Sequence, residues 1–90
     1  MLFMVVERFR TPGARDVYRR ARDQGRMMPD NIKYVASWVD LEFKNCWQLM
    51  EAENAEALDP WLERWRDLVD FDVVPVRTSA EAFEAIKPLL

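Results

Sequence analysis

Apolar and polar positions along the chain alternate in a way that predicts four strands. Residues 2–9 are rich in β-branched and aromatic side chains and apolar on both faces as far as Glu7, which is typical of a strand covered on both sides. Residues 32–41 and 46–52 follow as a second and a third strand joined in a hairpin. A fourth strand is expected at residues 71–76.

Two longer segments have helical spacing. Apolar positions recur at three- and four-residue intervals over residues 14–28, after a strand break expected at residues 11–13. Gly25 weakens the last turn of this helix, and residues 29–31 end it. Residues 54–68 are expected to form the second helix, between the third and fourth strands.

The remaining signals concern helix starts and one strand edge. Asp59 followed by Pro60 is a good cap and first-turn pair, so the regular part of the second helix is expected to begin at Pro60. Thr78 and Glu81 resemble a capping box that opens a short third helix. Pro75 cannot donate to a strand ladder and predicts an edge position for the fourth strand. The third helix is expected to turn its apolar side chains inward, namely Phe83, Ile86 and Leu89 or Leu90.

The order β-α-β-β-α-β predicts one α+β domain over residues 1–90. With right-handed crossovers it gives a ferredoxin-like sandwich, in which helices cover one face of an antiparallel four-stranded sheet. We expect the first and third strands to be central, parallel neighbours and the second and fourth to be edges. Three strands are apolar on both faces, but one protomer has helices for only one face. We therefore expect a homodimer in which two helix-free faces pack together.

Composition limits the class of protein. Half of the 90 residues are hydrophobic and four are tryptophan, which is typical of a globular chain. Residues 1–33 carry eight basic and four acidic side chains, and residues 34–90 carry five and twelve, so the net charge of −3 disfavours a general nucleic-acid binder. No segment reads as a membrane span or a secretory signal, and a lone Cys46 fits a reducing compartment, so a cytoplasmic protein is expected.

Missing residue types exclude most enzyme templates. The chain has no histidine, and therefore lacks the commonest general base and metal ligand. Two glycines cannot make a glycine-rich phosphate loop, and one cysteine cannot make a zinc site. We expect neither a metal nor a cofactor.

A pair of carboxylates is the first candidate site. If the first and third strands run parallel, Glu7 and Glu51 meet at the strand ends, where a semi-buried pair could act as general acid and base. The alternative is that both lie at the sheet rim, paired with Arg8, Arg10 or Lys33. The general rarity of functional carboxylate pairs favours that alternative.

The second candidate is a ligand-binding face on the hairpin. It joins apolar surface to a few hydrogen-bonding groups, which is the composition of a small-molecule pocket and equally of a core or dimer interface. Its members are Tyr34, Trp38, Gln48 and Met50, beside Cys46. Gln48 discriminates between these interpretations, because a buried amide needs partners. For Cys46 itself, burial as a small hydrophobic residue is favoured over a reactive thiol.

A basic stripe on the first helix is the third candidate. Arg15, Arg19, Arg22 and Arg26 are spaced to lie along one helix face and could hold phosphates or an acidic partner. The simpler interpretation is a solvated face with Asp16–Arg20 and Arg19–Asp23 pairs.

Several segments resemble a family of short bacterial proteins known only as a domain of unknown function. The segments are residues 1–9, 34–39, 46–51 and 65–76, so the resemblance covers nearly the whole chain. It implies a dimeric α/β barrel related to the ferredoxin-like fold. It supplies no established activity and no catalytic residues.

The interpretation that we prefer is a homodimer that binds a small apolar or aromatic molecule, or a protein partner. A cofactor-independent oxygenase or isomerase of the dimeric α/β-barrel type is the alternative, by analogy of fold alone. A purely structural interaction module is the third interpretation.

Overall fold

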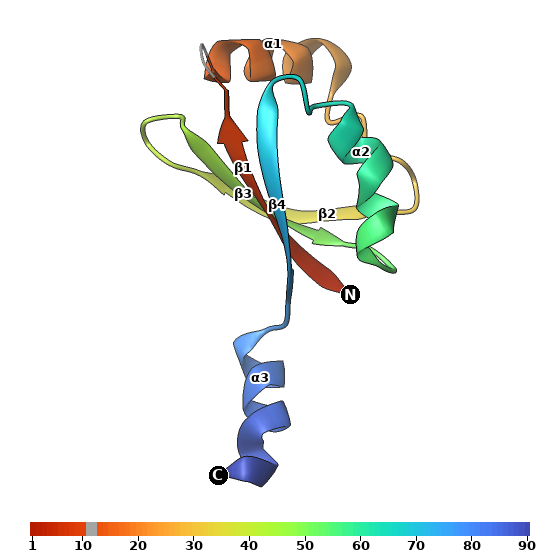
Figure 1. Cartoon of the computed structure of the whole chain (residues 1–90), viewed down its shortest axis with the longest axis vertical. Coiled ribbons are helices and arrows are strands. Elements are labelled where there is room, and N and C mark those ends of the chain that lie inside the picture. Colours follow the sequence, from red (N-terminus) through yellow and green to blue (C-terminus); the bar gives the residue numbers. More distant parts are fainter. Residues whose placement is uncertain (11–12) are drawn as a thin grey trace.

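The computed structural model describes residues 1–10 and 13–90 and contains one four-stranded sheet (Figure 1). The sheet order is β2-β3-β1-β4, so β1 and β3 are central and β2 and β4 are edges, as expected. The strands are β1 (Leu2–Phe9), β2 (Lys33–Val39), β3 (Asn45–Glu51) and β4 (Val69–Val76). The helices are α1 (Ala14–Gln24), α2 (Asp59–Glu63) and α3 (Ser79–Ile86), with 3₁₀ turns η1 (Ala55–Leu58) and η2 (Lys87–Leu89). The α+β, ferredoxin-like prediction is confirmed.

The central strands β1 and β3 are antiparallel, so the expectation of parallel neighbours was wrong. Both β1 and β2 run antiparallel to β3 and therefore run in the same direction as each other. The reason is the hairpin: α1 returns the chain so that β2 repeats the direction of β1, and the tight turn then reverses β3. Glu7 pairs with Cys46, whereas Glu51 pairs with Leu2 at the opposite end of the strands. The two carboxylates are therefore not brought together.

An irregularity in β2 changes which of its side chains face the helices. Tyr34 pairs with Met50, but the register then shifts so that Ala36 pairs with Leu49 and Trp38 with Trp47. An extra residue in one strand turns all following side chains to the other face. Trp38 therefore lies on the helix-free face, which corrects the prediction that it shares a face with Tyr34.

The hydrophobic core lies between the sheet and the helices. Alternate positions of β1 are buried on this side, and the second helical segment supplies most of the opposite wall. The buried core residues include Phe3, Val5, Met50, Leu58, Trp61, Leu62, Trp65 and Val69. The other face of the sheet is only partly covered, with Trp38 56% exposed.

The observed helix boundaries coincide with glycine and proline signals in the sequence, and they differ from the ranges predicted from apolar spacing. α1 ends at Gln24, because Gly25 adopts φ 68° and donates its N–H to the Ala21 carbonyl, so the helix does not continue to residue 28. The regular second helix, α2, begins at Asp59 after the η1 turn, close to the start expected at Pro60, but it ends at Glu63 and does not continue to residue 68. The strand break expected at Thr11 and Pro12 lies outside the described residues.

The third helix forms as expected but points away from the core. Thr78 accepts a hydrogen bond from the Glu81 N–H at 3.1 Å, and the Glu81 carboxylate accepts one from the Thr78 N–H at 3.1 Å, which completes the capping box. In Figure 1, α3 continues beyond the end of β4 and stands clear of the sheet. The prediction that its apolar side chains turn inward was therefore wrong: residues 77–90 are all exposed.

Replacing Leu58 by Ala should destabilise the protein by about 2–5 kcal/mol, because Leu58 is fully buried and the space left by its side chain cannot close completely. Urea unfolding at fixed protein concentration, followed by far-UV circular dichroism, measures the change. Leu41→Ala, at a position that is 97% exposed, is the matched control and should change stability by less than about 0.5 kcal/mol. Equal effects of the two substitutions would contradict the assigned core.

Candidate functional site

A cavity of about 120 Å³ lies between the sheet and the helices. Its size is close to the roughly 150 Å³ of a cavity that can hold benzene, so it suits a single six-membered ring. Its wall combines aromatic and aliphatic surface with a few polar groups, as small-molecule sites do. The lining residues are Glu7, Phe9, Val17, Tyr18, Ala21, Arg26, Ser37, Val39, Cys46, Gln48, Trp61 and Trp65.

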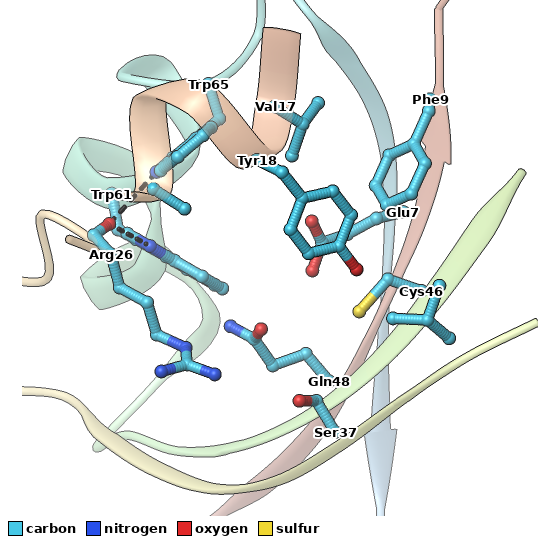
Figure 2. A pocket seen from close by; sticks show the side chains of 12 residues that line it. Glu7, Phe9, Val17, Tyr18, Arg26, Ser37, Cys46, Gln48, Trp61 and Trp65 are labelled. Atoms are coloured by element: carbon cyan, nitrogen blue, oxygen red, sulfur yellow. Dashed lines mark hydrogen bonds between the residues drawn. The ribbon is translucent and has the colours of Figure 1, made fainter. Parts of the chain in front are cut away.

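Glu7 is the chemically unusual member of this wall. It is only 9% exposed, and its Oε2 atom is buried without a hydrogen-bond partner among the described residues. Burial disfavours the charged carboxylate and raises the pKa of Glu7 to about 7, although the Cys46 thiol and the positive charge of Arg26 act in the opposite direction. Figure 2 shows the Glu7 carboxyl group behind the Tyr18 ring, among the other polar groups of the site.

Two polar residues of β3 share this buried face with Glu7. Cys46 lies directly opposite Glu7 in the strand register, and Gln48 lies opposite Val5. Burial, followed by the negative charge of Glu7, raises the pKa of Cys46 to about 12, so the residue is a neutral thiol near pH 7 rather than a nucleophile. The Gln48 amide is 6% exposed, and its one side-chain hydrogen bond within the described structure is a weak one to the Met50 sulfur at 3.6 Å. Its remaining polar capacity is available to a ligand.

Arg26 enters the site because α1 stops early. Its backbone carbonyl accepts hydrogen bonds from the indole N–H groups of both Trp61 and Trp65, each at 3.0 Å (Figure 2). These bonds tie the segment after α1 to α2, which carries Trp61, and to the turn after α2, which carries Trp65. The Arg26 guanidinium lies 3.9 Å from the centre of the Tyr34 ring, a cation–π distance, and its charge acts on Glu7.

Tyr18 closes part of the cavity from α1. Its ring makes edge-to-face contacts with Phe9 and Phe43, at centroid distances of 6.3 and 6.0 Å. Partial burial, with smaller contributions from Cys46 and Glu7, raises the pKa of the Tyr18 hydroxyl. The group is therefore protonated near neutral pH and can donate or accept a hydrogen bond.

The predicted ligand-binding residues are divided among three locations. Gln48 lines the cavity. Tyr34 lies beside it, where its hydroxyl is hydrogen-bonded to the Ser37 hydroxyl at 2.8 Å. Met50 is fully buried in the core, and Trp38 is on the opposite face of the sheet because of the irregularity in β2. Of the predicted acid–base pair, Glu7 lines the cavity and Glu51 is exposed at the other end of the sheet.

The basic stripe on α1 is shorter than predicted and pairs differently. Arg26 lies past the helix end and does not continue the stripe. Arg19 pairs with Asp16 at 3.5 Å, and Arg20 pairs with Asp67 at 2.6 Å, instead of the expected Asp16–Arg20 and Arg19–Asp23 pairs. The Asp67 partner, distant in sequence, attaches α1 to the segment before β4 and draws Arg20 away from Asp16.

Sequence reasoning missed the helix-borne half of the cavity. The spacing of Tyr18, Trp61 and Trp65 places them on the apolar sides of the two predicted helices. That of Arg26 places it on the basic stripe of the first helix, so none of them is predicted beside Glu7. Two signals could have identified them. Gly25 marks a helix end immediately before Arg26, and two tryptophans four residues apart present two indole N–H groups on one helix face, which need acceptors when buried.

The arrangement is suited to binding and to proton transfer. A carboxyl group with a pKa near 7 can both take up and release a proton at neutral pH, and Gln48 and Tyr18 can orient a polar group beside it. In the described part of the chain, no group of three or more His, Cys, Asp or Glu side chains is placed to hold a metal ion. Nor is any helix in residues 1–10 and 13–90 long and apolar enough to cross a membrane.

The stability of the protein should fall as the pH rises from about 4.5 to 7. The pKa of Glu7 is higher in the folded state than its ordinary value of 4.5, so the folded state binds the proton more tightly. The contribution is fully present below pH 4.5 and is lost as the pH passes 7, a change of about 3 kcal/mol. Glu7→Gln should remove this dependence and raise stability at pH 8, as measured by urea unfolding at pH 5 and pH 8.

Glu51→Gln is the control for this measurement, because Glu51 is exposed on a neighbouring strand. It should leave the pH profile of the wild-type protein unchanged. Parallel profiles for the wild type and Glu7→Gln would show that Glu7 is not the buried titrating group.

Comparison with known proteins gives one match. The family described as "Domain of unknown function (DUF3303)" matches residues 1–90. No curated protein and no solved structure matches the chain significantly. The match spans both the strands that carry Glu7 and Gln48 and the helices that cover them, and it brings no established activity. The chain belongs to the DUF3303 family of domains of unknown function.

Proposed function

We propose that this domain is a homodimer in which each protomer binds one small, single-ring molecule in the cavity between the sheet and the helices. The observation that carries the proposal is the Glu7 Oε2 atom, which is buried and has no hydrogen-bond partner among the described residues. Leaving such a group unsatisfied costs about 1–3 kcal/mol or more, which a ligand that donates a hydrogen bond would recover.

The chemistry of the wall indicates the class of ligand. Phe9, Trp61 and Trp65 offer aromatic surface to an apolar ring. Glu7 requires a donor, such as a hydroxyl or amine group on that ring. The Gln48 amide can accept or donate a second hydrogen bond. A monocyclic aromatic or alicyclic molecule with one hydroxyl or amine group fits these requirements.

Exposed apolar surface supports the homodimer. On the helix-free face, Trp38, Trp47 and Val74 are 56%, 37% and 44% exposed, and they lie on three different strands. A contiguous apolar face of this kind is typical of an interaction site. A cytoplasmic location is part of the same proposal, because the single cysteine, Cys46, is buried and cannot form an intramolecular disulfide.

Phenol tests the proposal, with toluene as its matched apolar probe. Phenol should shift the indole N–H resonances of Trp61 and Trp65 in ¹H–¹⁵N NMR spectra and leave those of Trp38 and Trp47, on the other face, unchanged. The hydrogen bond to Glu7 should make phenol bind about tenfold to a hundredfold more tightly than toluene.

Glu7→Leu tests the contribution of the carboxyl group, because leucine is similar in size to glutamate but has no hydrogen-bond acceptor. It should reduce the affinity for phenol to that for toluene. Equal affinities of the two probes for the wild type, or no shift of either indole resonance at millimolar concentration, would refute a hydrogen-bonding site at Glu7.

A cofactor-independent isomerase is a second candidate function, favoured by one observation: the Glu7 pKa of about 7 suits a general base at neutral pH. Such an enzyme would move a proton from one carbon atom of a small carbonyl compound to another through the Glu7 carboxylate. Cyclohexanone in deuterated water should then exchange its α-protons faster with the protein than without it, as followed by ¹H NMR. Glu7→Gln should abolish the acceleration. Exchange at the buffer rate would leave binding as the function.

A further inference from the structure

The third helix has the composition of a packed helix but no surface to pack on. Its apolar side chains Phe83 and Ile86 are 55% and 50% exposed, and Leu89 and Leu90 in and after the η2 turn are 82% and 85% exposed. They recur at three- and four-residue intervals and so form one apolar side. Figure 1 shows the helix standing beyond the sheet, which accounts for the 48 Å length of the molecule.

Such a helix needs a partner to be stable. α3 has eight residues, and isolated helices shorter than about 12–15 residues are marginal in water even with good sequences. The capping box adds only about 1 kcal/mol. Most of the stability of a helix in a protein comes from packing of its apolar side, and that contribution is missing in a single chain.

The connection to β4 prevents α3 from folding back onto its own sheet without rearrangement. Only Arg77 and Thr78 separate the strand from the helix, and the capping box at Thr78 sets the direction in which the helix leaves. Val76, at the end of β4, pairs with Leu2 of β1, whereas Trp47 of β3 pairs with Val6 of β1. Trp47 therefore lies about 13 Å back along the strands from Val76, opposite to the direction in which α3 leaves.

The helix-free face of a second copy is the complementary surface. It is apolar and exposed, and it lacks the second layer that α1 and α2 provide on the other side. Trp38, Trp47 and Phe83, which are 56%, 37% and 55% exposed, together offer about 300 Å² of aromatic surface per chain. The aliphatic side chains add a similar area, so two chains can bury roughly 1,200 Å² in total, the lower end of the range for stable interfaces.

We propose that, in the homodimer on which the proposed function rests, α3 of each protomer crosses to the partner and packs its apolar side against the partner's helix-free sheet face. The exchange is reciprocal, since a two-fold axis makes each chain both donor and acceptor of one helix. The cavity with Glu7 lies on the other side of the sheet and stays intact, so dimerisation and ligand binding use separate surfaces.

Sedimentation of a double variant, Phe83→Glu with Ile86→Glu, tests the arrangement. Both positions are exposed in the single chain, so the fold should survive, and an unchanged far-UV circular dichroism spectrum reports on it whether or not phenol binds. We expect the wild type to be a dimer at 10 μM, on the order of a typical assay concentration, and the variant to dissociate at least a hundredfold more readily. Glu84→Gln, on the same helix, is the control and should leave the dimer unchanged.

Cross-linking then separates exchange from folding back. Chains carrying Ala82→Cys on α3 are mixed with ¹⁵N-labelled chains carrying Ala36→Cys on the sheet face and treated with a short bismaleimide. Exchange predicts a cross-linked product of one labelled and one unlabelled chain. A chain carrying both substitutions that cross-links only within itself would overturn the proposal. A wild-type dimer unaffected by the double variant would overturn the helix exchange alone, and a monomeric wild type would overturn the dimer as well.

Discussion

The antiparallel register between β1 and β3 is the constraint on which both surfaces of this protein depend. It sets Glu7 opposite Cys46 and Val5 opposite Gln48, so that the polar groups of the cavity share one buried face. Side chains alternate along a strand with a period of two, and a slip of one residue would turn Glu7 to the helix-free face and Val6 toward the core. The buried carboxyl group and the apolar outer face therefore follow from the same pairing.

Burial of Glu7 stands out against the treatment of the other charges discussed above. Arg8, Arg10 and Arg20 pair with Asp72, Asp70 and Asp67 at the surface, where such pairs cost little and contribute little. The Glu7 carboxyl group, by contrast, is nine-tenths buried and lacks a hydrogen bond on one oxygen. Its burial therefore lowers the stability of the folded protein at neutral pH. Positions at which a chain departs from otherwise consistent folding rules are where function is expected. That contrast, more than the cavity volume, is the reason to assign the site to Glu7.

The two faces of the sheet differ in chemistry because adjacent residues of β3 point in opposite directions. Gln48 faces the cavity, and Trp47 faces away from the helices. One layer of backbone separates the cavity from an apolar face that none of the described helices covers. The cavity is covered by α1, by Trp61 of α2 and by Trp65 in the turn that follows. The proposed ligand site and the proposed dimer surface therefore lie on opposite faces of the sheet.

The sequence by itself determined the elements, their order and several of their boundaries. The strand at residues 2–9, the edge position of the strand with Pro75, the start of the second helix near Pro60 and the capping box at Thr78 all depend on short-range chemistry. Side-chain periodicity, proline geometry and caps act over a few residues, so the sequence expresses them directly.

Tertiary structure alone decided the direction of β3 relative to β1 and the irregularity that moves Trp38 to the other face. It decided as well that the Arg26 carbonyl accepts hydrogen bonds from two indole N–H groups. It also decided that α3 leaves the sheet instead of covering it. Each of these depends on contacts between residues far apart in the chain, whose geometry is set by how whole elements pack. Periodicity specifies which side chains must be covered, but only the packed fold specifies what covers them.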